Sequence, residues 1–310
     1  MLALEKFRDP SRTAKGERRA DVAFRGVRTL WFNTGTLCNI ECAHCYIESS
    51  PTNDRLAYLA LADIVPFLDE LDAAGERKIE IGFTGGEPFM APEAPAMIEA
   101  ALERGHRVLV LTNAMRPMRR PRVAARLKVL RDAYPGKLSL RVSLDHFKAA
   151  RHDAERGAGA FEEALAGLDW LAHMGFPISV AGRSLWNETA SQAREGYRIL
   201  FAERSLPIDA SDPQALVLFP EMTPDADPPE ISVGCWSILK KSPDDVMCAS
   251  QRMVVKPKGA TAPAVLACTL LPYDDRFELG STLAEARRPV ALNHPYCSSF
   301  CVLGGGACSR

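Results

Sequence analysis

Short apolar runs alternate with longer amphipathic stretches over the first two thirds of the chain. The short runs are rich in β-branched and aromatic residues, and the longer stretches repeat apolar positions at helical spacing. Alternation of this kind is typical of a parallel sheet whose strands are joined by right-handed crossover helices. The pattern therefore predicts about six βα units, which place the chain in the α/β class.

Each unit can be assigned to a segment of the sequence. The predicted strands are Arg28 to Asn33, Lys78 to Thr84, Arg107 to Thr112, Leu138 to Ser143, Pro177 to Ala181 and Gln214 to Leu218. The predicted helices are Leu61 to Ala73, Ala94 to Glu103, Arg122 to Ala133, Phe161 to Met174 and Ser191 to Phe201. Six units are too few for a complete eight-stranded barrel, so the pattern allows either an open doubly wound sheet or an incomplete barrel.

The last third of the chain has a different pattern. Pro and Asp are frequent between Leu206 and Ile231, which predicts a boundary near residue 225. Beyond it, Met253 to Lys256 and Val265 to Cys268 predict a β-hairpin, followed by a short helix near Leu283 to Arg288. The predicted domains are an N-terminal extension at 1–27, a barrel at 28–225 and a small cysteine-rich hairpin and helix domain at 226–310.

Composition and charge exclude several classes of protein. The chain is 47% hydrophobic and 25% charged, and its formal net charge is −1. So small a charge gives no field that would attract nucleic acid or an anionic membrane. The sequence has neither a secretory signal nor the long apolar run of a membrane span. We therefore expect a cytoplasmic protein with no nucleic-acid or membrane partner.

The cysteines fall into two groups. Three of the nine lie near the start of the chain and six lie after residue 234. In a reducing compartment such clusters indicate metal ligands rather than disulfides. Cys38, Cys42 and Cys45 follow the first predicted strand, and three thiolates can hold a four-iron cubane with one iron left open. A structural zinc site that uses His44, or buried thiols without a metal, are the alternatives.

The first group carries a family resemblance. The segment from Cys38 to Tyr46, Cys-Asn-Ile-Glu-Cys-Ala-His-Cys-Tyr, resembles the signature of radical S-adenosylmethionine (SAM) enzymes. The resemblance implies a partial (β/α)6 TIM-like barrel with a catalytic 4Fe-4S cluster on Cys38, Cys42 and Cys45. It also implies that SAM binds the open iron, beside Tyr46, and is cleaved reductively to methionine and a 5′-deoxyadenosyl radical.

Further motifs predict the SAM site. Glycines in Gly82-Phe83-Thr84-Gly85-Gly86-Glu87-Pro88 let backbone approach a ligand, although the motif alone also fits a plain strand-to-helix turn. The resemblance implies that Gly85, Gly86 and Glu87 contact the methionine amino group. Polar residues at later strand ends resemble family positions near the SAM ribose and carboxylate, with a capping or exposed structural role as the alternative. These residues are Asn113, Ser143, Asp145 and Arg183.

One position departs from the family pattern. His146 stands where the family often has Gly after Ser-Leu-Asp. The roles of His146 and Arg156 therefore stay open at this point.

The C-terminal cysteines resemble the auxiliary-cluster domains called twitch or SPASM. Six cysteines rather than about seven imply a shortened version with one auxiliary 4Fe-4S cluster. A zinc site on the same residues is the alternative. The preferred ligands are Cys248, Cys268, Cys297 and Cys301, and Cys235 and Cys308 are possible substitutes.

The resemblance implies hydrogen abstraction from a substrate that is a small molecule or a peptide. An auxiliary cluster that accepts the remaining electron would make the reaction a net oxidation. Only 37 residues precede Cys38, which favours a small molecule over a peptide that needs a leader-recognition domain. A SPASM-type peptide or protein maturase, and a noncatalytic iron-sulfur or zinc protein, are the alternatives. The implied reductant is of the flavodoxin or ferredoxin type.

Overall fold

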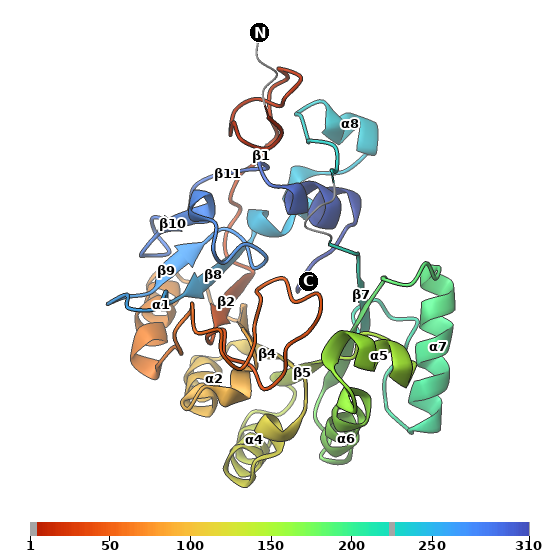
Figure 1. Cartoon of the computed structure of the whole chain (residues 1–310). Coiled ribbons are helices and arrows are strands. Elements are labelled where there is room, and N and C mark those ends of the chain that lie inside the picture. Colours follow the sequence, from red (N-terminus) through yellow and green to blue (C-terminus); the bar gives the residue numbers. More distant parts are fainter. Residues whose placement is uncertain (1–4, 223–226, 310) are drawn as a thin grey trace.

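The structure is a computed structural model that describes residues 5–222 and 227–309. The predicted domain break near residue 225 lies outside the described residues. The fold is an α/β barrel that remains open, with a smaller C-terminal part beside it (Figure 1).

Within the described residues, nine strands form one sheet in the order β10-β9-β8-β2-β3-β4-β5-β6-β7. The six parallel strands β2 to β7 supply the predicted βα units. They are β2 Thr29–Asn33, β3 Glu80–Thr84, β4 Arg107–Thr112, β5 Leu138–Ser143, β6 Ile178–Arg183 and β7 Leu216–Phe219. Among the described residues the edge strands β10 and β7 do not pair, which confirms a partial barrel.

Helices cover the outer face of the parallel strands (Figure 1). Predicted and observed helices agree within two residues at each end. The predicted helices are α1 Leu61–Ala73, α2 Ala94–Glu103, α4 Pro121–Ala133, α6 Ala160–His173 and α7 Ala190–Glu203. Three shorter helices were not predicted, namely α3 Arg116–Arg119, α5 Ala149–Arg156 and α8 Cys235–Leu239.

The C-terminal part continues the sheet of the barrel. The predicted hairpin is present as β8 Gln251–Val255 and β9 Ala264–Leu266, and β10 Glu278–Gly280 follows. Strand β8 pairs in parallel with β2, so the hairpin extends the barrel sheet at its first strand. The short helix predicted near Leu283 to Arg288 is wrong, because that segment forms only a turn.

The N-terminal extension packs against the C-terminal part. Strand β1 Asp21–Val22 pairs with β11 Val290–Ala291. The buried Arg19 guanidinium donates to the carbonyls of Asp9 and Leu292 and forms an ion pair with Glu230. The extension therefore joins segments that are far apart in the sequence.

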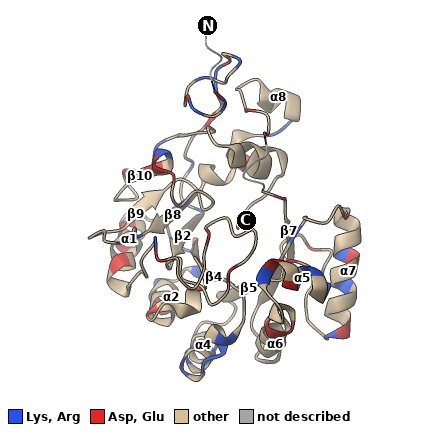
Figure 2. Cartoon of the chain, viewed as in Figure 1, with Lys and Arg blue, Asp and Glu red and all other residues tan. Residues whose placement is uncertain are grey.

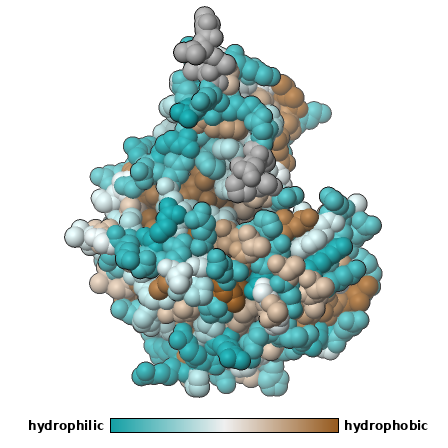
Figure 3. Space-filling view, in the orientation of Figure 1, coloured by the Kyte–Doolittle hydropathy of each residue, from teal (hydrophilic) through white to brown (hydrophobic). Residues whose placement is uncertain are grey.

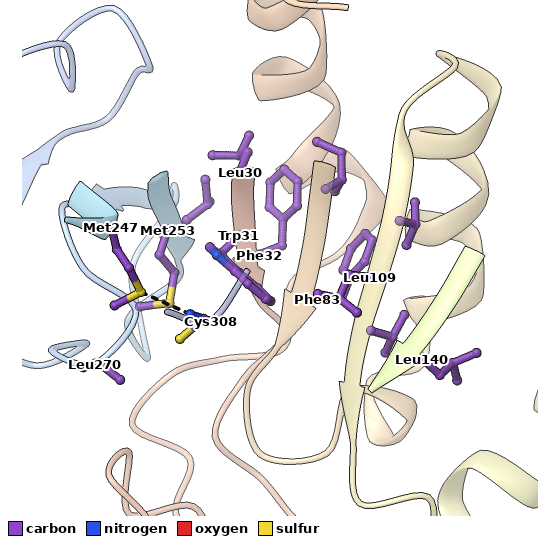
Figure 4. Packing of buried hydrophobic residues seen from close by; sticks show 14 of the residues in the cluster. Leu30, Trp31, Phe32, Phe83, Leu109, Leu140, Met247, Met253, Leu270 and Cys308 are labelled. Carbon is purple, nitrogen blue, oxygen red and sulfur yellow. Dashed lines mark hydrogen bonds between the residues drawn. The ribbon is translucent and has the colours of Figure 1, made fainter. Parts of the chain in front are cut away.

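Apolar side chains cover the helix-facing side of the parallel strands, and on β2 the opposite side also carries a large buried one. Leu30 and Phe32 of β2 point toward the helices, and Phe32 lies 6.4 Å from Phe67 of α1 between ring centroids. Trp31 points the other way (Figure 4), and its indole N–H donates to Gln251 of β8 over 3.0 Å. Alternation along β2 thus builds two layers of core from one strand.

The surface shown in Figure 3 is mostly hydrophilic, with apolar atoms gathered near α8, where Ile238 is 78% exposed. Among the described residues, the structure contains no helix with the length and apolar composition of a membrane span.

Candidate active site

A cavity opens at the carboxyl ends of the parallel strands, where barrel enzymes carry their chemistry. Nearly all residues predicted for the cluster and SAM line this one cavity. They are Cys38, Cys42, Cys45, Tyr46, Gly85, Gly86, Asn113, Ser143, Asp145 and Arg183. Glu87 is the exception, because it lies behind the wall.

The cysteine loop is closed at its base and held on one side. Leu37 pairs with Ser50 in a short bridge that closes the loop. The His44 ring nitrogen Nδ1 lies 2.7 Å from a Glu155 carboxylate oxygen of α5, and Arg183 donates to the His44 carbonyl over 3.2 Å. His44 is therefore directed toward Glu155, and Arg183 supports the cysteine loop from β6.

The three thiols form a donor set that suits an iron-sulfur cluster. Cys38, Cys42 and Cys45 are all free of disulfides. Burial raises the pKa of Cys38 to about 12. Burial also raises the pKa of Cys42, an effect that the Arg156 guanidinium opposes. Thiolates at such buried positions require positive charge beside them, which iron would supply. The residues present therefore fit the cluster.

The glycine motif packs directly on the start of the cysteine loop. The Gly86 N–H donates to the Gly35 carbonyl over 2.8 Å. A Cβ on Gly86 would stand 2.3 Å from the Leu37 carbonyl oxygen, and one on Gly85 would stand 2.6 Å from the Gly35 oxygen. Gly85 also has φ +134°, a conformation that favours glycine. A side chain at either position would therefore clash with the neighbouring backbone, and both glycines also line the cavity.

The Glu87 carboxylate is turned into the protein. It accepts hydrogen bonds from the Thr112 hydroxyl and the Asn113 N–H, each over 2.8 Å, and from the Phe89 N–H over 3.2 Å. Burial raises the pKa of Glu87 to about 7, and these three donors oppose the rise. Its contacts fix the end of β4, where the Asn113 side chain reaches the cysteine loop.

Asp145 and Arg156 form a bidentate ion pair in the cavity wall. The Arg156 Nε lies 2.7 Å from one carboxylate oxygen and its terminal nitrogen 3.0 Å from the other. Burial raises the pKa of Asp145, but the Arg156 guanidinium outweighs burial and holds it below its usual range. Arg156 thus places a positive charge near both Asp145 and Cys42.

His146 does not line this cavity. Its Nε2 lies 2.9 Å from a Glu188 carboxylate oxygen, and its ring stacks on Phe147 at 4.0 Å between centroids. His146, which stands where the family often has Gly, therefore links the loop after β5 to the loop after β6 through its contact with Glu188.

Sequence reasoning missed the apolar wall of the cavity. It is formed by side chains that no motif marks, from β7 and the C-terminal part: Phe219, Met222, Leu270 and Phe300. Phe219 and Phe300 lie 5.7 Å apart between ring centroids. The one available signal was the position of Phe300 between Cys297 and Cys301.

Four C-terminal cysteines surround a second cavity. Cys248, Cys268, Cys297 and Cys301 line it, together with the buried Arg252. Burial raises the pKa of Cys248 to about 11 and that of Cys297 to about 12.

The other two C-terminal cysteines lie elsewhere. The Cys308 thiol lines the first cavity, 3.3 Å from the Thr269 hydroxyl. Cys235 lies at the start of α8, with its sulfur 3.6 Å from the Ser232 hydroxyl.

The open parallel barrel and the three-thiol cavity at its mouth define a class of enzyme that holds a cofactor on a cysteine loop. The family model described as the radical SAM superfamily matches residues 32–189. The chain belongs to this superfamily, whose members use a 4Fe-4S cluster and SAM.

Two curated proteins illustrate the similarity of sequence. The chain is 33% identical over 145 residues to the antilisterial bacteriocin subtilosin biosynthesis protein AlbA of Bacillus subtilis, covering 46% of this chain and 30% of AlbA. It is 30% identical over 144 residues to the AdoMet-dependent heme synthase of Methanosarcina barkeri, covering 46% of this chain and 38% of that protein. The match thus spans about a third of the length of these curated relatives.

A solved structure extends the likeness of fold. Streptococcus suis SuiB bound to S-adenosylmethionine superposes with a TM-score of 0.59 at 11% identity, over 83% of this chain and 63% of SuiB. SuiB has also been solved bound to its precursor peptide SuiA. At this identity the comparison establishes the fold alone.

Proposed function

We propose that this enzyme cleaves SAM reductively at a 4Fe-4S cluster on Cys38, Cys42 and Cys45 and abstracts hydrogen from a bound substrate. The observation that carries the proposal is the convergence of these three thiols with the glycine motif and Asn113 on one cavity. When bound, the cluster and SAM together supply a carbon-centred radical that can remove hydrogen from an unactivated C–H bond.

The residues around the cavity would have three roles, namely contact with SAM, support of the cysteine loop and positioning of the cavity wall. The Gly85 and Gly86 backbone and the side chains of Asn113 and Ser143 would contact SAM. The Asp145–Arg156 pair and Arg183 would keep the cysteine loop fixed and supply positive charge beside thiolates. Glu87 would act as a positioning residue, because its three hydrogen bonds hold Thr112 and Asn113 in the wall.

We also propose an auxiliary 4Fe-4S cluster on Cys248, Cys268, Cys297 and Cys301. The four thiols line one small cavity, as ligands of a shared group must. Tetrahedral zinc would require sulfurs within about 4 Å of each other. A zinc site on the same four cysteines is the alternative.

The substrate is proposed to be a peptide or small molecule that presents an apolar group. The wall of Phe219, Met222, Leu270 and Phe300 supports an apolar group, because such surface is buried favourably against similar surface. The names of AlbA and of the SuiB–SuiA complex support a peptide, and the name of the heme synthase supports a small molecule. A net oxidation would use the auxiliary cluster as the electron acceptor.

Iron and sulfide analysis tests both clusters. Anaerobically purified wild type should contain about eight irons per chain, and a variant with Cys38, Cys42 and Cys45 changed to Ala about four. Four irons falling to none would overturn the auxiliary cluster.

An activity assay tests the reaction. With dithionite, the wild type should release 5′-deoxyadenosine from SAM, and the triple variant should release none. No release from wild type with an intact cluster would overturn the proposed reaction.

A further inference from the structure

A long stretch of the chain carries only positive charge. From Arg104 to Arg131 there are nine Lys and Arg residues and no Asp or Glu, although the whole chain has 38 basic and 39 acidic residues. Four exposed members lie on α3, α4 and the residue between them: Arg116, Arg120, Arg122 and Lys128. We call these four residues the α3–α4 basic surface, and Figure 2 shows the charge on α4.

This surface begins beside the cysteine loop. The Asn113 amide nitrogen lies 2.9 Å from the Asn39 side-chain oxygen and 3.9 Å from the Cys38 sulfur. The Asn39 amide nitrogen in turn lies 3.6 Å from the Met115 sulfur. Arg116 follows directly, at the start of α3. Helix α4 also begins at this end, because crossover helices start near the carboxyl ends of the strands.

We propose that the α3–α4 basic surface is the docking site for an acidic electron-carrier protein that reduces the cluster on Cys38, Cys42 and Cys45. The inference rests on the proposed function, since that reaction requires an electron from outside the chain. The carrier loses one electron to the cluster, and no atom or proton is transferred. Complementary charge would guide the carrier to a part of the surface that adjoins the cysteine loop.

The charge distribution favours a small, transient protein contact over nucleic acid. Glu163 pairs with Arg119 and, over 3.7 Å, with Arg116, and Glu99 pairs with Arg126. Among the described residues no acidic side chain pairs with Arg120, Arg122 or Lys128, so the unneutralised charge is confined to a few residues. Val129, 51% exposed on α4, adds apolar contact area of a kind that phosphate backbones do not use. Electron-transfer complexes are small and weak, and a patch of this size suits them.

The test compares two reductants on one variant. Arg116→Glu/Arg122→Glu reverses two exposed charges on residues outside the proposed cluster and SAM sites. A flavodoxin with a strongly acidic surface serves as the protein reductant, and dithionite serves as a reductant that needs no docking. At low salt the variant should release 5′-deoxyadenosine at least about tenfold more slowly than wild type with flavodoxin. With dithionite the two rates should agree within about twofold.

The matched control is Lys15→Glu/Lys240→Glu. It makes the same change of charge on exposed residues of the N-terminal extension and the end of α8, at the opposite end of the molecule from α4 (Figure 1). Its flavodoxin-driven rate should equal that of wild type. Added salt should slow the flavodoxin-driven reaction of wild type, so that the difference between wild type and the test variant disappears.

Several results would overturn the inference. One is an unchanged flavodoxin-driven rate in Arg116→Glu/Arg122→Glu, and another is an equal deficit in the control. If the test variant loses iron, Lys128→Glu replaces it and should give a smaller loss with flavodoxin alone. Tight binding of a 30-nucleotide RNA that the variant loses, with its flavodoxin-driven rate intact, would assign the surface to nucleic acid. Failure of wild type with both reductants would instead reject the proposed function.

Discussion

Gly86→Ala should damage the cysteine loop rather than SAM binding alone. The new Cβ would stand 2.3 Å from the Leu37 oxygen, 2.6 Å from the Leu37 carbonyl carbon and 2.8 Å from the Thr36 oxygen. All three atoms are backbone, so no side chain can rotate away. Because ordinary contact begins at 3.4 Å, one of the two segments must move by about 1 Å.

The size of the effect follows from that displacement. Overpacking of this kind costs about 2 to 3 kcal/mol, which should lower the melting temperature by about 5 °C. Cys38 follows Leu37 directly, so a shift of the loop would misplace the first predicted ligand. A displacement of about 1 Å at a reacting group can cost about a hundredfold in rate, and we expect at least about a tenfold loss of 5′-deoxyadenosine release.

Iron content, melting temperature and SAM affinity should be measured together on Gly86→Ala and on Gly234→Ala. Gly234 is the control because its added Cβ would meet only the Ser232 hydroxyl, at 3.8 Å. The control should retain all three properties. A Gly86→Ala protein with full iron and an unchanged melting temperature would refute the packing argument, and reduced SAM affinity in that protein would assign the glycine to the ligand instead.

Three further substitutions test buried polar groups in different parts of the fold. Burial lowers the pKa of His106, whose ring nitrogens have no partner among the described residues. Below pH 6.5 the unfolded chain therefore binds a proton at this ring more readily than the folded protein does, so the folded protein loses stability as the pH falls. His106→Leu should therefore raise the melting temperature more at pH 5.5 than at pH 8, and an equal change at both pH values would contradict this. Tyr197→Phe removes the 2.6 Å hydrogen bond to the Leu144 carbonyl and should lower the free energy of unfolding in urea by about 1 to 2 kcal/mol. An unchanged free energy of unfolding would show that water replaces the hydroxyl. Arg19→Met leaves the Glu230 carboxylate without its buried partner and should cost about 3 to 5 kcal/mol, and a cost below about 1 kcal/mol would show that the pair is dispensable.

The strands and long helices of the barrel could be predicted because their burial follows simple periodicity. Strand β2 is buried at all five positions, and such a strand appears in sequence as an unbroken apolar run. Helix α5 could not be found in this way, since the residues it buries are His152 and Glu155. Polar residues buried by specific partners give no hydrophobic pattern.

The candidate site was predictable to the extent that its residues lie in local motifs. The cysteine loop and the glycine motif each occupy one segment, and the motifs that follow strand ends reach the same cavity because parallel strands share an edge. The inward turn of Glu87 could not be predicted, because it depends on the Thr112 and Asn113 donors from the neighbouring strand. The pairing of β8 with β2 is likewise a long-range contact that leaves no local pattern.

That pairing has a consequence for the two cysteine sites. Because β8 joins the barrel sheet, the C-terminal part contributes directly to the wall of the first cavity through Leu270 and Phe300. Leu270 also lines the second cavity, and Phe300 lies on the π-helical segment Cys297–Leu303 that carries two of its cysteines. A group bound by those cysteines would therefore hold the apolar wall in position. Loss of the proposed auxiliary cluster should then change the shape of the first cavity even where Cys38, Cys42 and Cys45 are untouched.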